Sequence, residues 1–241
     1  MTDLGRLTWP EIEIGRPLLL VPLGSCEQHG PHLPLDTDAR IAVAVAERFA
    51  RCRPAPRVAP PPPEEDGSPA PRSAVVAPVL AYGSSGEHAG FAGTLSIGQD
   101  ALEHVLTELG RSADHFAGLV FINGHGGNLP SLQRAGRTLR AEGRRVLVWS
   151  PPAAHGDAHA GRTETSVLLA LCPELVRVDR AEAGAKAPLA DLLSVLRSGG
   201  VLAASANGVL GDPAGASAAE GEQWLRGWVA DLAAAVDAWI A

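Results

Sequence analysis

One short segment, residues 24–38 (GSCEQHGPHLPLDTD), carries several side chains that can bind metal ions. Within it, Glu27, His29 and Asp38 combine carboxylates with an imidazole, a ligand set that suits Zn, Mn or Fe. A carboxylate in such a set can also bridge two ions. One segment cannot complete two coordination shells, so a two-ion site needs further ligands from other parts of the chain.

Two later segments offer such ligands. In FINGHGGN, His125 is followed by two glycines, which allow the backbone to turn tightly and to approach a ligand closely. In HGDAHAGRTETS, His159 and Glu164 lie five residues apart, and we expect Glu164 just inside a helix that Thr163 caps. Together with the first segment, these sequences predict three loops that converge on one site.

Some nearby polar residues have simpler explanations. Asp36 is better explained as a helix cap or as a hydrogen-bond acceptor behind the ligands than as a ligand itself. His104 and His115 are ordinary surface residues, whereas His88 belongs to a glycine-rich loop that could reach the site. We interpret Cys26 as a packing residue, because the sequence gives it no base partner.

The order of apolar and amphipathic segments predicts how these loops are positioned. Residues 17–23 form a continuous apolar run, as expected of a strand that is covered on both faces of a parallel sheet. Further strands are predicted at 74–83, 118–124 and 144–150, and helices at 37–52, 99–116, 129–143 and 216–241. This alternation favours an α/β fold with a mostly parallel sheet between helical layers. In such sheets ligands collect beyond the carboxyl ends of the strands.

Length and composition exclude several classes of protein. A chain of 241 residues fits a single α/β domain over 1–241, with the Pro-rich residues 53–73 as a surface loop. Its 20 Lys and Arg and 27 Asp and Glu give a net charge of -7 without a basic block, so no nucleic-acid partner is expected. Without a signal layout or a membrane-length apolar run, we expect a cytoplasmic protein with no membrane partner. Three cysteines without close pairing predict neither disulfides nor a thiolate zinc site.

Four motifs resemble, in order and spacing, the signature motifs of the creatininase family of dinuclear-metal amidohydrolases: GSCEQHGPHLPLDTD, YGSSGEHAGFAGTLSIG, FINGHGGN and HAGRTETS. The resemblance runs from about residue 17 to residue 171. It implies a three-layer α/β/α sandwich of the creatininase type with two divalent ions per subunit, which could be Zn, Fe or Mn. It also implies a homo-oligomer, commonly a hexamer in this family.

The same resemblance implies roles for the candidate ligands. Glu27 and His125 would bind one ion, His29 would bind the other, and Asp38 would bridge both. True creatininases have a carboxylate ligand two positions after the histidine that matches His125. This chain has Gly127 there, so one coordination shell needs another carboxylate.

Glu164 is the natural replacement ligand, as in relatives with the GHGGN form, although it could instead orient a ligand from behind. His159 matches the family's histidine near the substrate, and we expect it to donate a proton or to polarise the scissile carbonyl. Two ions would lower the pKa of a bridging water and stabilise the oxyanion that develops during amide hydrolysis.

Candidate substrate contacts are Ser85 and His88 in the glycine-rich loop, Asn128 after the FINGHGG motif, and His155. Creatininases place tryptophans around their small flat substrate. His155 stands where one of these tryptophans would be expected, which argues against creatinine as the substrate.

Further motifs, GNLPSL, KAPLADLL and GVLGDP, resemble the branch of the family that trims the modified precursor peptide in mycofactocin biosynthesis. This narrower resemblance implies a peptidase that releases the modified C-terminal Val-Tyr dipeptide of that peptide. Two alternatives stay open: a hydrolase of creatinine, another cyclic amide or a formamide, and a non-catalytic metal-binding scaffold subunit. Hydrolysis that a chelator abolishes would exclude the scaffold.

Overall fold

The computed structural model of the chain describes residues 3–54, 73–152 and 158–240. Four parallel strands form its sheet in the spatial order β2-β1-β3-β4. Their bounds are β1 Leu18–Leu23, β2 Ala74–Val76, β3 Gly118–Asn123 and β4 Val146–Trp149. The predicted parallel sheet is therefore confirmed. The strand predicted at 74–83 is shorter than expected, because Pro78 follows it closely and cannot donate to a strand ladder.

The central strand β1 shows why a continuous apolar run forms a strand here. All six of its residues are buried, and successive side chains point to opposite faces of the sheet. Leu18 and Leu20 pack into the core on one face, whereas Leu19, Val21 and Leu23 pack into the core on the other. Two separate apolar cores thus hold the sheet from both sides.

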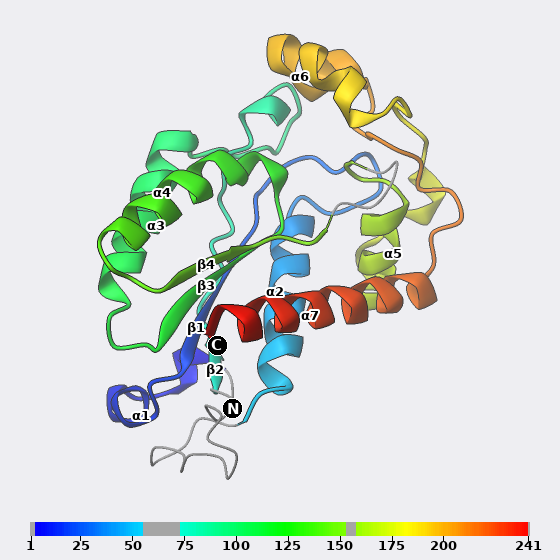
Figure 1. Cartoon of the computed structure of the whole chain (residues 1–241). Helices are drawn as coiled ribbons and strands as arrows, with labels where there is room; N and C mark the ends of the chain where they lie inside the picture. Colours follow the sequence, from blue (N-terminus) through cyan, green and yellow to red (C-terminus); the bar gives the residue numbers. More distant parts are fainter. Residues whose placement is uncertain (1–2, 55–72, 153–157, 241) are drawn as a thin grey trace.

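Helices cover both faces of the sheet (Figure 1). On one side lie α2 (Thr37–Arg51), α5 (Arg162–Leu171) and α7 (Ala218–Ile240), which pack with one another. On the other side α3 (Gln99–Ser112) packs against α4 (Leu129–Ala141). This arrangement confirms the predicted three-layer α/β/α sandwich.

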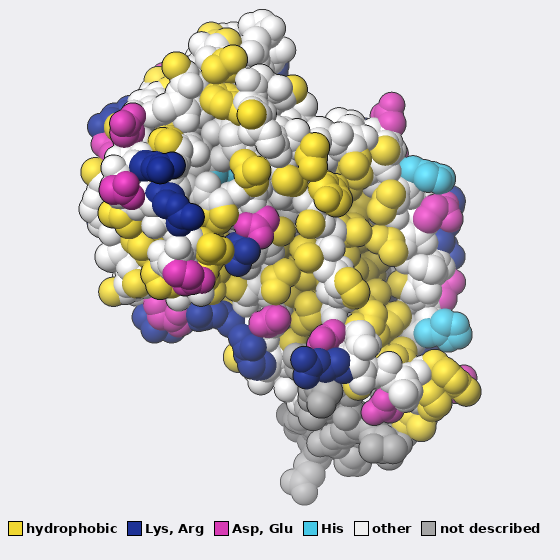
Figure 2. Space-filling view, turned by 180° about the vertical axis from the view of Figure 1, so that it is seen from behind, with side chains coloured by type: hydrophobic (Ala, Val, Ile, Leu, Met, Phe, Trp, Pro, Cys, Tyr) yellow, Lys and Arg dark blue, Asp and Glu magenta, His cyan; other side chains and the backbone are white. Residues whose placement is uncertain are grey.

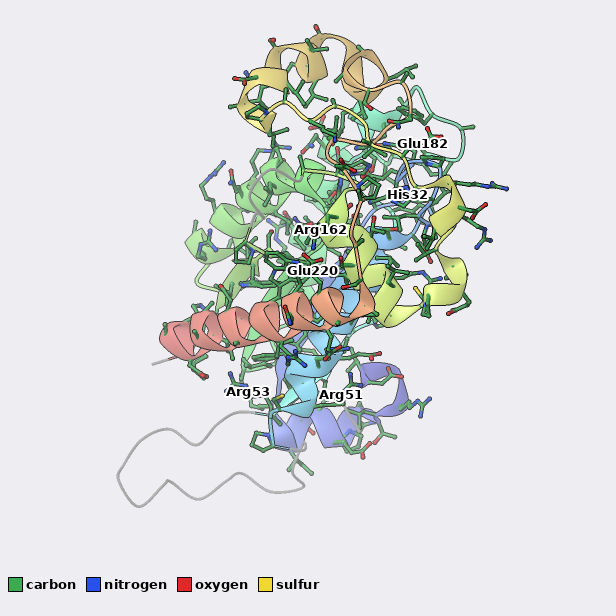
Figure 3. All side chains as sticks on the ribbon, turned by 90° about the vertical axis from the view of Figure 1, so that its right-hand side faces the viewer. His32, Arg51, Arg53, Arg162, Glu182 and Glu220 are labelled. Atoms are coloured by element: carbon green, nitrogen blue, oxygen red, sulfur yellow. The ribbon has the colours of Figure 1, made fainter. Side chains whose placement is uncertain are left out.

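The long closing helix α7 confirms the amphipathic helix predicted at the end of the sequence. Trp228 is buried in the core, and Trp224 and Trp239 pack against it, as expected of core aromatics. An ion pair joins the beginnings of α5 and α7, with Arg162 Nε 2.8 Å from Glu220 Oε2; both residues are labelled in Figure 3. The pair links α7 to the start of α5, which carries part of the functional site.

Smaller elements lie around the sandwich. Helix α1 (Trp9–Gly15) lies near the amino ends of the strands, and α6 (Leu189–Ala204) lies beyond their carboxyl ends (Figure 1). Short 3-10 turns occur at η1 (Leu4–Arg6), η2 (Gly86–His88), η3 (Gly126–Asn128), η4 (Pro173–Leu175) and η5 (Val178–Arg180). Helix α6 packs on η2, and its backbone kinks at Gly200, where φ is 69°.

One helix cap differs from the prediction, and other expectations reach beyond the described residues. The residue that caps α5 is Gly161, and Thr163 lies within the first turn of that helix, so the predicted Thr163 cap is wrong. Most of the loop expected at 53–73 lies outside the described residues. Within the described parts of the chain, no helix combines the length and the hydropathy that a membrane span requires.

Candidate metal centre

The candidate ligands come from loops that leave the neighbouring strands β1 and β3 at their carboxyl ends. Leu23 and Asn123, the last residues of these strands, pair with each other. The glycine that follows each strand allows the start of α2 to approach. A Cβ atom on Gly24 would lie 2.3 Å from the backbone nitrogen of Ala39, and one on Gly124 would lie 2.4 Å from the carbonyl oxygen of Asp38.

A first group of ligands consists of Glu27, Asp38 and His125, all buried. His125 Nδ1 lies 3.1 Å from Glu27 Oε1 and 3.4 Å from Asp38 Oδ2. The other ring nitrogen of His125, Nε2, donates to the carbonyl oxygen of Ser84 at 3.0 Å. This bond leaves Nδ1 facing the two carboxylates, as a metal ligand requires.

A second group consists of His29, His159 and Glu164. His29 Nδ1 donates to the carbonyl oxygen of Glu27 at 3.1 Å, which leaves Nε2 facing the site. Nε2 lies 3.9 Å from Glu164 Oε2, and Glu164 also accepts a hydrogen bond from the Ala160 backbone at 2.6 Å. The structure thus brings the sequence-predicted replacement carboxylate to the second group.

Asp38 lies between the two groups. Its Oδ1 is 3.0 Å from His29 Nε2, whereas its Oδ2 is 3.4 Å from His125 Nδ1. Ser25 donates to Oδ2 at 2.7 Å and holds the carboxylate in this orientation. Asp38 also lies in the first turn of α2, where the helix dipole favours a negative charge. One carboxylate oxygen therefore faces each group, the geometry that a bridging ligand needs.

The chemistry of Glu27 fits a bound cation. Glu27 is fully buried, and neither of its carboxylate oxygens has a hydrogen-bond partner within the described part of the chain. A buried carboxylate without hydrogen bonds is costly unless a cation or a metal balances it. Oxygen and imidazole nitrogen ligands of this kind suit Zn, Mn or Fe.

The two carboxylates and the two inner histidines shift one another's pKa values strongly. Burial opposes the charged form of Glu27, but His125 and His29 outweigh it and bring its pKa to about 2. Burial also opposes protonation of His29, yet Asp38, Glu164 and Glu27 raise its pKa to about 10. In the same way, Glu27 and Asp38 overcome the effect of burial and raise the pKa of His125 well above its usual value. The site therefore attracts positive charge, whether protons or metal ions.

Two further histidines, His88 and His159, stay neutral. Burial, with the positive charges of His29 and His125 nearby, lowers the pKa of His88 to about 4. Burial, together with His29 and His88, lowers the pKa of His159 to about 3. With Glu27 they form a third set of possible ligands, and His88 Nε2 lies 3.3 Å from Glu27 Oε1. His88 therefore reaches the centre, as its glycine-rich loop allowed.

At position 127 the structure leaves no room for a side chain. A Cβ atom on Gly127 would lie 2.3 Å from His125 Nε2, 2.4 Å from Glu87 Oε1 and 2.5 Å from the carbonyl oxygen of Ser84. A carboxylate ligand therefore cannot extend from this position without moving the loop. The carboxylate ligand that position 127 cannot supply must therefore come from another part of the chain, such as Glu164.

The other predicted substrate contacts fall in different places. Ser85 is fully buried, and its hydroxyl has no hydrogen-bond partner within the described residues. Asn128 is also fully buried, and its amide accepts from the Ser84 backbone and donates to the carbonyl oxygen of Gly24. Asn128 thus belongs to the scaffold that joins the loops. His155 lies outside the described residues.

A cavity of about 560 Å³ opens beside the centre. His125, His159 and Glu164 contribute to its wall, and much of the rest is apolar, including Leu129. Lys186, the only lysine of the chain, also lines it, and its ammonium group pairs with the carboxylate of Asp212.

Two residues of the site were missed by reasoning from the sequence. Ser25 and Gln28 contact ligands or neighbouring histidines directly. Both lie inside the ligand-rich segment, which was the available signal. Neither residue type is a usual metal ligand, so residue type alone does not single them out.

Comparison with known proteins adds to this geometry. A family model described as Creatininase, creatinine amidohydrolase, matches residues 5–236. The mycofactocin precursor peptide peptidase of Mycobacterium ulcerans (strain Agy99) is 49% identical over 246 residues, with 98% of this chain and 91% of that protein covered. The protein of the same name from Mycolicibacterium smegmatis is 50% identical over 240 residues, with 99% and 92% covered. A creatinine amidohydrolase of Pseudomonas putida is 32% identical over 73% of this chain and 74% of that protein.

Solved structures agree with these relationships. A tryptophan-to-phenylalanine mutant of creatininase superposes with a TM-score of 0.78 at 29% identity, covering 98% of each chain. A mutant creatininase described as Zn-Zn type gives 0.75 at 28% identity, with 98% of this chain and 96% of that one covered. A structure named Creatininase Mn gives 0.71 at 28% identity, with 98% and 97% covered. The chain is a hydrolase that acts on amide bonds, and it belongs to the creatininase family.

Proposed function

We propose that this hydrolase is a peptidase with two divalent metal ions, and that it releases the modified C-terminal Val-Tyr dipeptide from the mycofactocin precursor peptide. The observation that carries the metal part is the shared position of Asp38, whose two oxygens face two separate ligand groups. The names of the relatives with about 50% identity over nearly the whole chain support the choice of substrate.

The ligand assignment follows from the two groups. Glu27, Asp38 and His125 would hold one ion, and His29, Asp38 and Glu164 would hold the other. Two divalent ions in such a site lower the pKa of a water molecule and polarise a carbonyl group. Zn, Fe or Mn would each suit these ligands.

His159 is the residue that we propose to move protons. Its lowered pKa keeps the imidazole neutral near pH 7 but also makes it a weak base, so its position supports this role: Nδ1 lies 3.8 Å from Glu27 Oε1, on the side of the ligand groups, where its lone pair can take a proton from water. The protonated ring can then deliver that proton to the departing amine, which must be protonated before the bond breaks. In this order of steps, His159 acts first as a base and then as an acid. From the sequence alone we expect a proton donor or a group that polarises the carbonyl; the role of base is added here.

The cavity supports a substrate larger than a small ring. Its volume of about 560 Å³ is within the usual range of roughly 300–1,000 Å³ for small-molecule sites and can accept a dipeptide-sized group. Its wall includes Pro151, Pro152, Leu129 and Leu189, which offer apolar contacts to a valine or to an aromatic ring. His125, His159 and Glu164 line the cavity, so a peptide bound in it could have its scissile bond near the ligand groups.

The test is a comparison of substrates by mass spectrometry. Purified protein supplied with Zn, Fe(II) or Mn is incubated separately with the modified precursor peptide and with creatinine, and a chelator serves as the control. We expect release of the dipeptide only from the peptide and only without chelator. Hydrolysis of creatinine with the peptide left intact would overturn the choice of substrate, and an unreactive protein under every condition would favour a scaffold subunit.

A further inference from the structure

Gln28 lies between the candidate ligands Glu27 and His29 in the sequence, and its side chain is buried. Its oxygen, Oε1, accepts a hydrogen bond from the backbone N–H of Gly30 at 2.8 Å. Its nitrogen, Nε2, donates to the carbonyl oxygen of Gly208 at 3.0 Å. A backbone N–H can only donate and a carbonyl oxygen can only accept, so these two bonds fix which end of the amide is nitrogen.

The backbone around the amide prevents it from turning. Gly208 has a φ of +79° and lies so close that a Cβ atom would be 1.9 Å from Gln28 Oε1. Gly30, on the other side, also has a positive φ of +63°. Both conformations favour glycine. The amide is thus held between two tight turns in a single orientation.

This orientation determines the tautomer of His88. An amide nitrogen carries two hydrogens, and one of them is used by Gly208. The other points to His88 Nδ1 at 2.9 Å, so Nδ1 accepts and carries no hydrogen. The proton of neutral His88 is therefore on Nε2, which lies 3.3 Å from Glu27 Oε1. The ring nitrogen of His88 that is near Glu27 thus carries the hydrogen and has no lone pair to offer a metal ion, although the pair does not form a hydrogen bond.

The tautomer of His159 follows from the same residue. His159 Nε2 lies 2.8 Å from the backbone carbonyl oxygen of Gln28, which can only accept, so Nε2 carries the proton. The amide nitrogen of Gln28 is 3.1 Å from the same ring nitrogen but has no third hydrogen to give. His159 Nδ1, 3.8 Å from Glu27 Oε1, consequently keeps its lone pair on the side of the ligands.

We propose that Gln28 is a positioning residue that fixes the tautomers of His88 and His159. Through its backbone carbonyl it keeps the lone pair of His159 on Nδ1, and through its side-chain amide it keeps the hydrogen of His88 on Nε2, the ring nitrogen that lies 3.3 Å from Glu27 Oε1. The set of Glu27, His88 and His159 is then a proton-transfer and positioning set and not a third ion site. The expected effect of Gln28 on catalysis rests on the proposed peptidase function. The assignment of the tautomers rests only on the hydrogen bonds.

The tautomers are tested directly by nitrogen NMR. In zinc-loaded, deuterated protein with ¹⁵N-labelled histidine, long-range ¹H–¹⁵N spectra distinguish Nδ1–H from Nε2–H rings, and His88→Asn and His159→Asn variants assign the signals. We expect Nε2–H for both residues in the natural sequence. In Gln28→Met, His88 should change to a mixture of tautomers, while His159 keeps its form because the backbone carbonyl remains. A proton on Nδ1 of either ring in the natural sequence would overturn the proposal.

Kinetics test the consequence. We expect Gln28→Met to lower kcat about 10- to 100-fold, the usual effect of removing a group that orients an active-site residue, with KM changed less than about threefold. The metal content should stay unchanged. Gln28→Glu, which keeps the shape of the side chain but removes the donor, should lose kcat in the same way.

Gln99→Met is the matched control. Gln99 Nε2 donates to the carbonyl oxygen of Gly127 at 2.6 Å, so this variant also loses a bond from a glutamine amide to the backbone. We expect its kcat to stay within about threefold of the natural value. If folded Gln28→Met has the same kcat as the natural protein, or if it loses its metal, the positioning role is contradicted. If the natural protein cleaves no peptide, the proposed function fails, and the NMR spectra still decide the tautomers.

Discussion

At the scale of single residues, the position of Asp38 has to meet several requirements at once. It lies at the start of a helix, is almost fully buried, and directs one oxygen to each ligand group. The sequence indicated the residue type and the spacing from Glu27 and His29. It could not show which oxygen faces which histidine, because that depends on the approach of α2 to two strand-end loops.

Replacing Asp38 with Ala should therefore remove both metal ions, because each group loses an oxygen ligand. Inductively coupled plasma mass spectrometry of purified protein measures the ions per chain. Asp36→Ala is the matched control: Asp36 lies two residues earlier and pairs with Arg40 at 2.7 Å, so this variant should keep its metal. Two ions per chain in Asp38→Ala would refute the bridging role.

A second prediction at this scale concerns protons. In the metal-free protein His29, with a pKa of about 10, and His125, with a pKa well above its usual value, are protonated near pH 7. An ion must displace these protons to bind their lone pairs, so metal affinity should rise as the pH rises from about 6 to 9. Calorimetry in buffers of different ionisation enthalpy should detect release of about two protons. Binding heats that do not depend on the buffer would contradict these pKa values.

At the scale of elements, glycines after the strands let ligand loops and the start of α2 meet. Reasoning from the sequence located β1, β3 and the turns after them, because apolar runs and glycine-rich segments have a clear local pattern. It did not locate the cap of α5 correctly. Thr163 is a good cap by residue type, but the helix is capped two residues earlier, at Gly161, after a turn in which Ala160 has a positive φ of 52°.

The turn after β3 gives a direct test of this packing. Gly127→Ala should destabilise the metal-free protein by about 1–3 kcal/mol, because the added methyl group meets His125, Glu87 and Ser84 at less than contact distance. Unfolding in urea measures the change. Gly126→Ala is the matched control, since nothing lies within 4 Å of its added Cβ atom, and it should change stability by less than about 1 kcal/mol. Equal effects of the two substitutions would contradict the crowding at Gly127.

The stability that His32 contributes, through its contact with α5, should depend on pH. His32, labelled in Figure 3, is buried with Nε2 2.9 Å from Thr165 Oγ1, and burial together with His29 lowers its pKa to about 4. Its folded pKa is below its unfolded value of about 6.5, so its contribution to stability is complete above pH 6.5 and is lost as the pH falls towards 4. Thermal unfolding of His32→Gln should show a weaker loss of stability over this range. An unchanged pH dependence would contradict a neutral buried His32.

At the scale of the whole molecule, the sandwich places its ligand loops at one end of the sheet and leaves apolar side chains exposed, some of them in loops next to the ligand segment. Figure 2 shows hydrophobic side chains gathered over the middle of one face. Large exposed apolar residues of the described chain include Tyr82, Leu95 and Ile97, which are 54%, 54% and 40% exposed. Large contiguous apolar patches often mark contacts between proteins.

We therefore propose that copies of the chain associate through apolar surface. Light scattering after size exclusion should give a mass that is a multiple of 24.9 kDa, about sixfold if the ring-shaped assembly expected from the family resemblance forms. A mass of one chain at all concentrations would contradict this proposal. The tryptophans of α7 pack in or against the core, so they are not the exposed apolar residues that this contact would use.

The most direct test of the central claim is a metal titration of peptide cleavage. Metal-free protein receives increasing Zn, Fe(II) or Mn, and the rate at which the dipeptide leaves the modified precursor peptide is measured by mass spectrometry at each step. The two ligand groups that share Asp38 predict no cleavage without metal and a rate that reaches its maximum at two ions per chain. Full cleavage by metal-free protein, or a maximum at one ion, would contradict a two-ion peptidase.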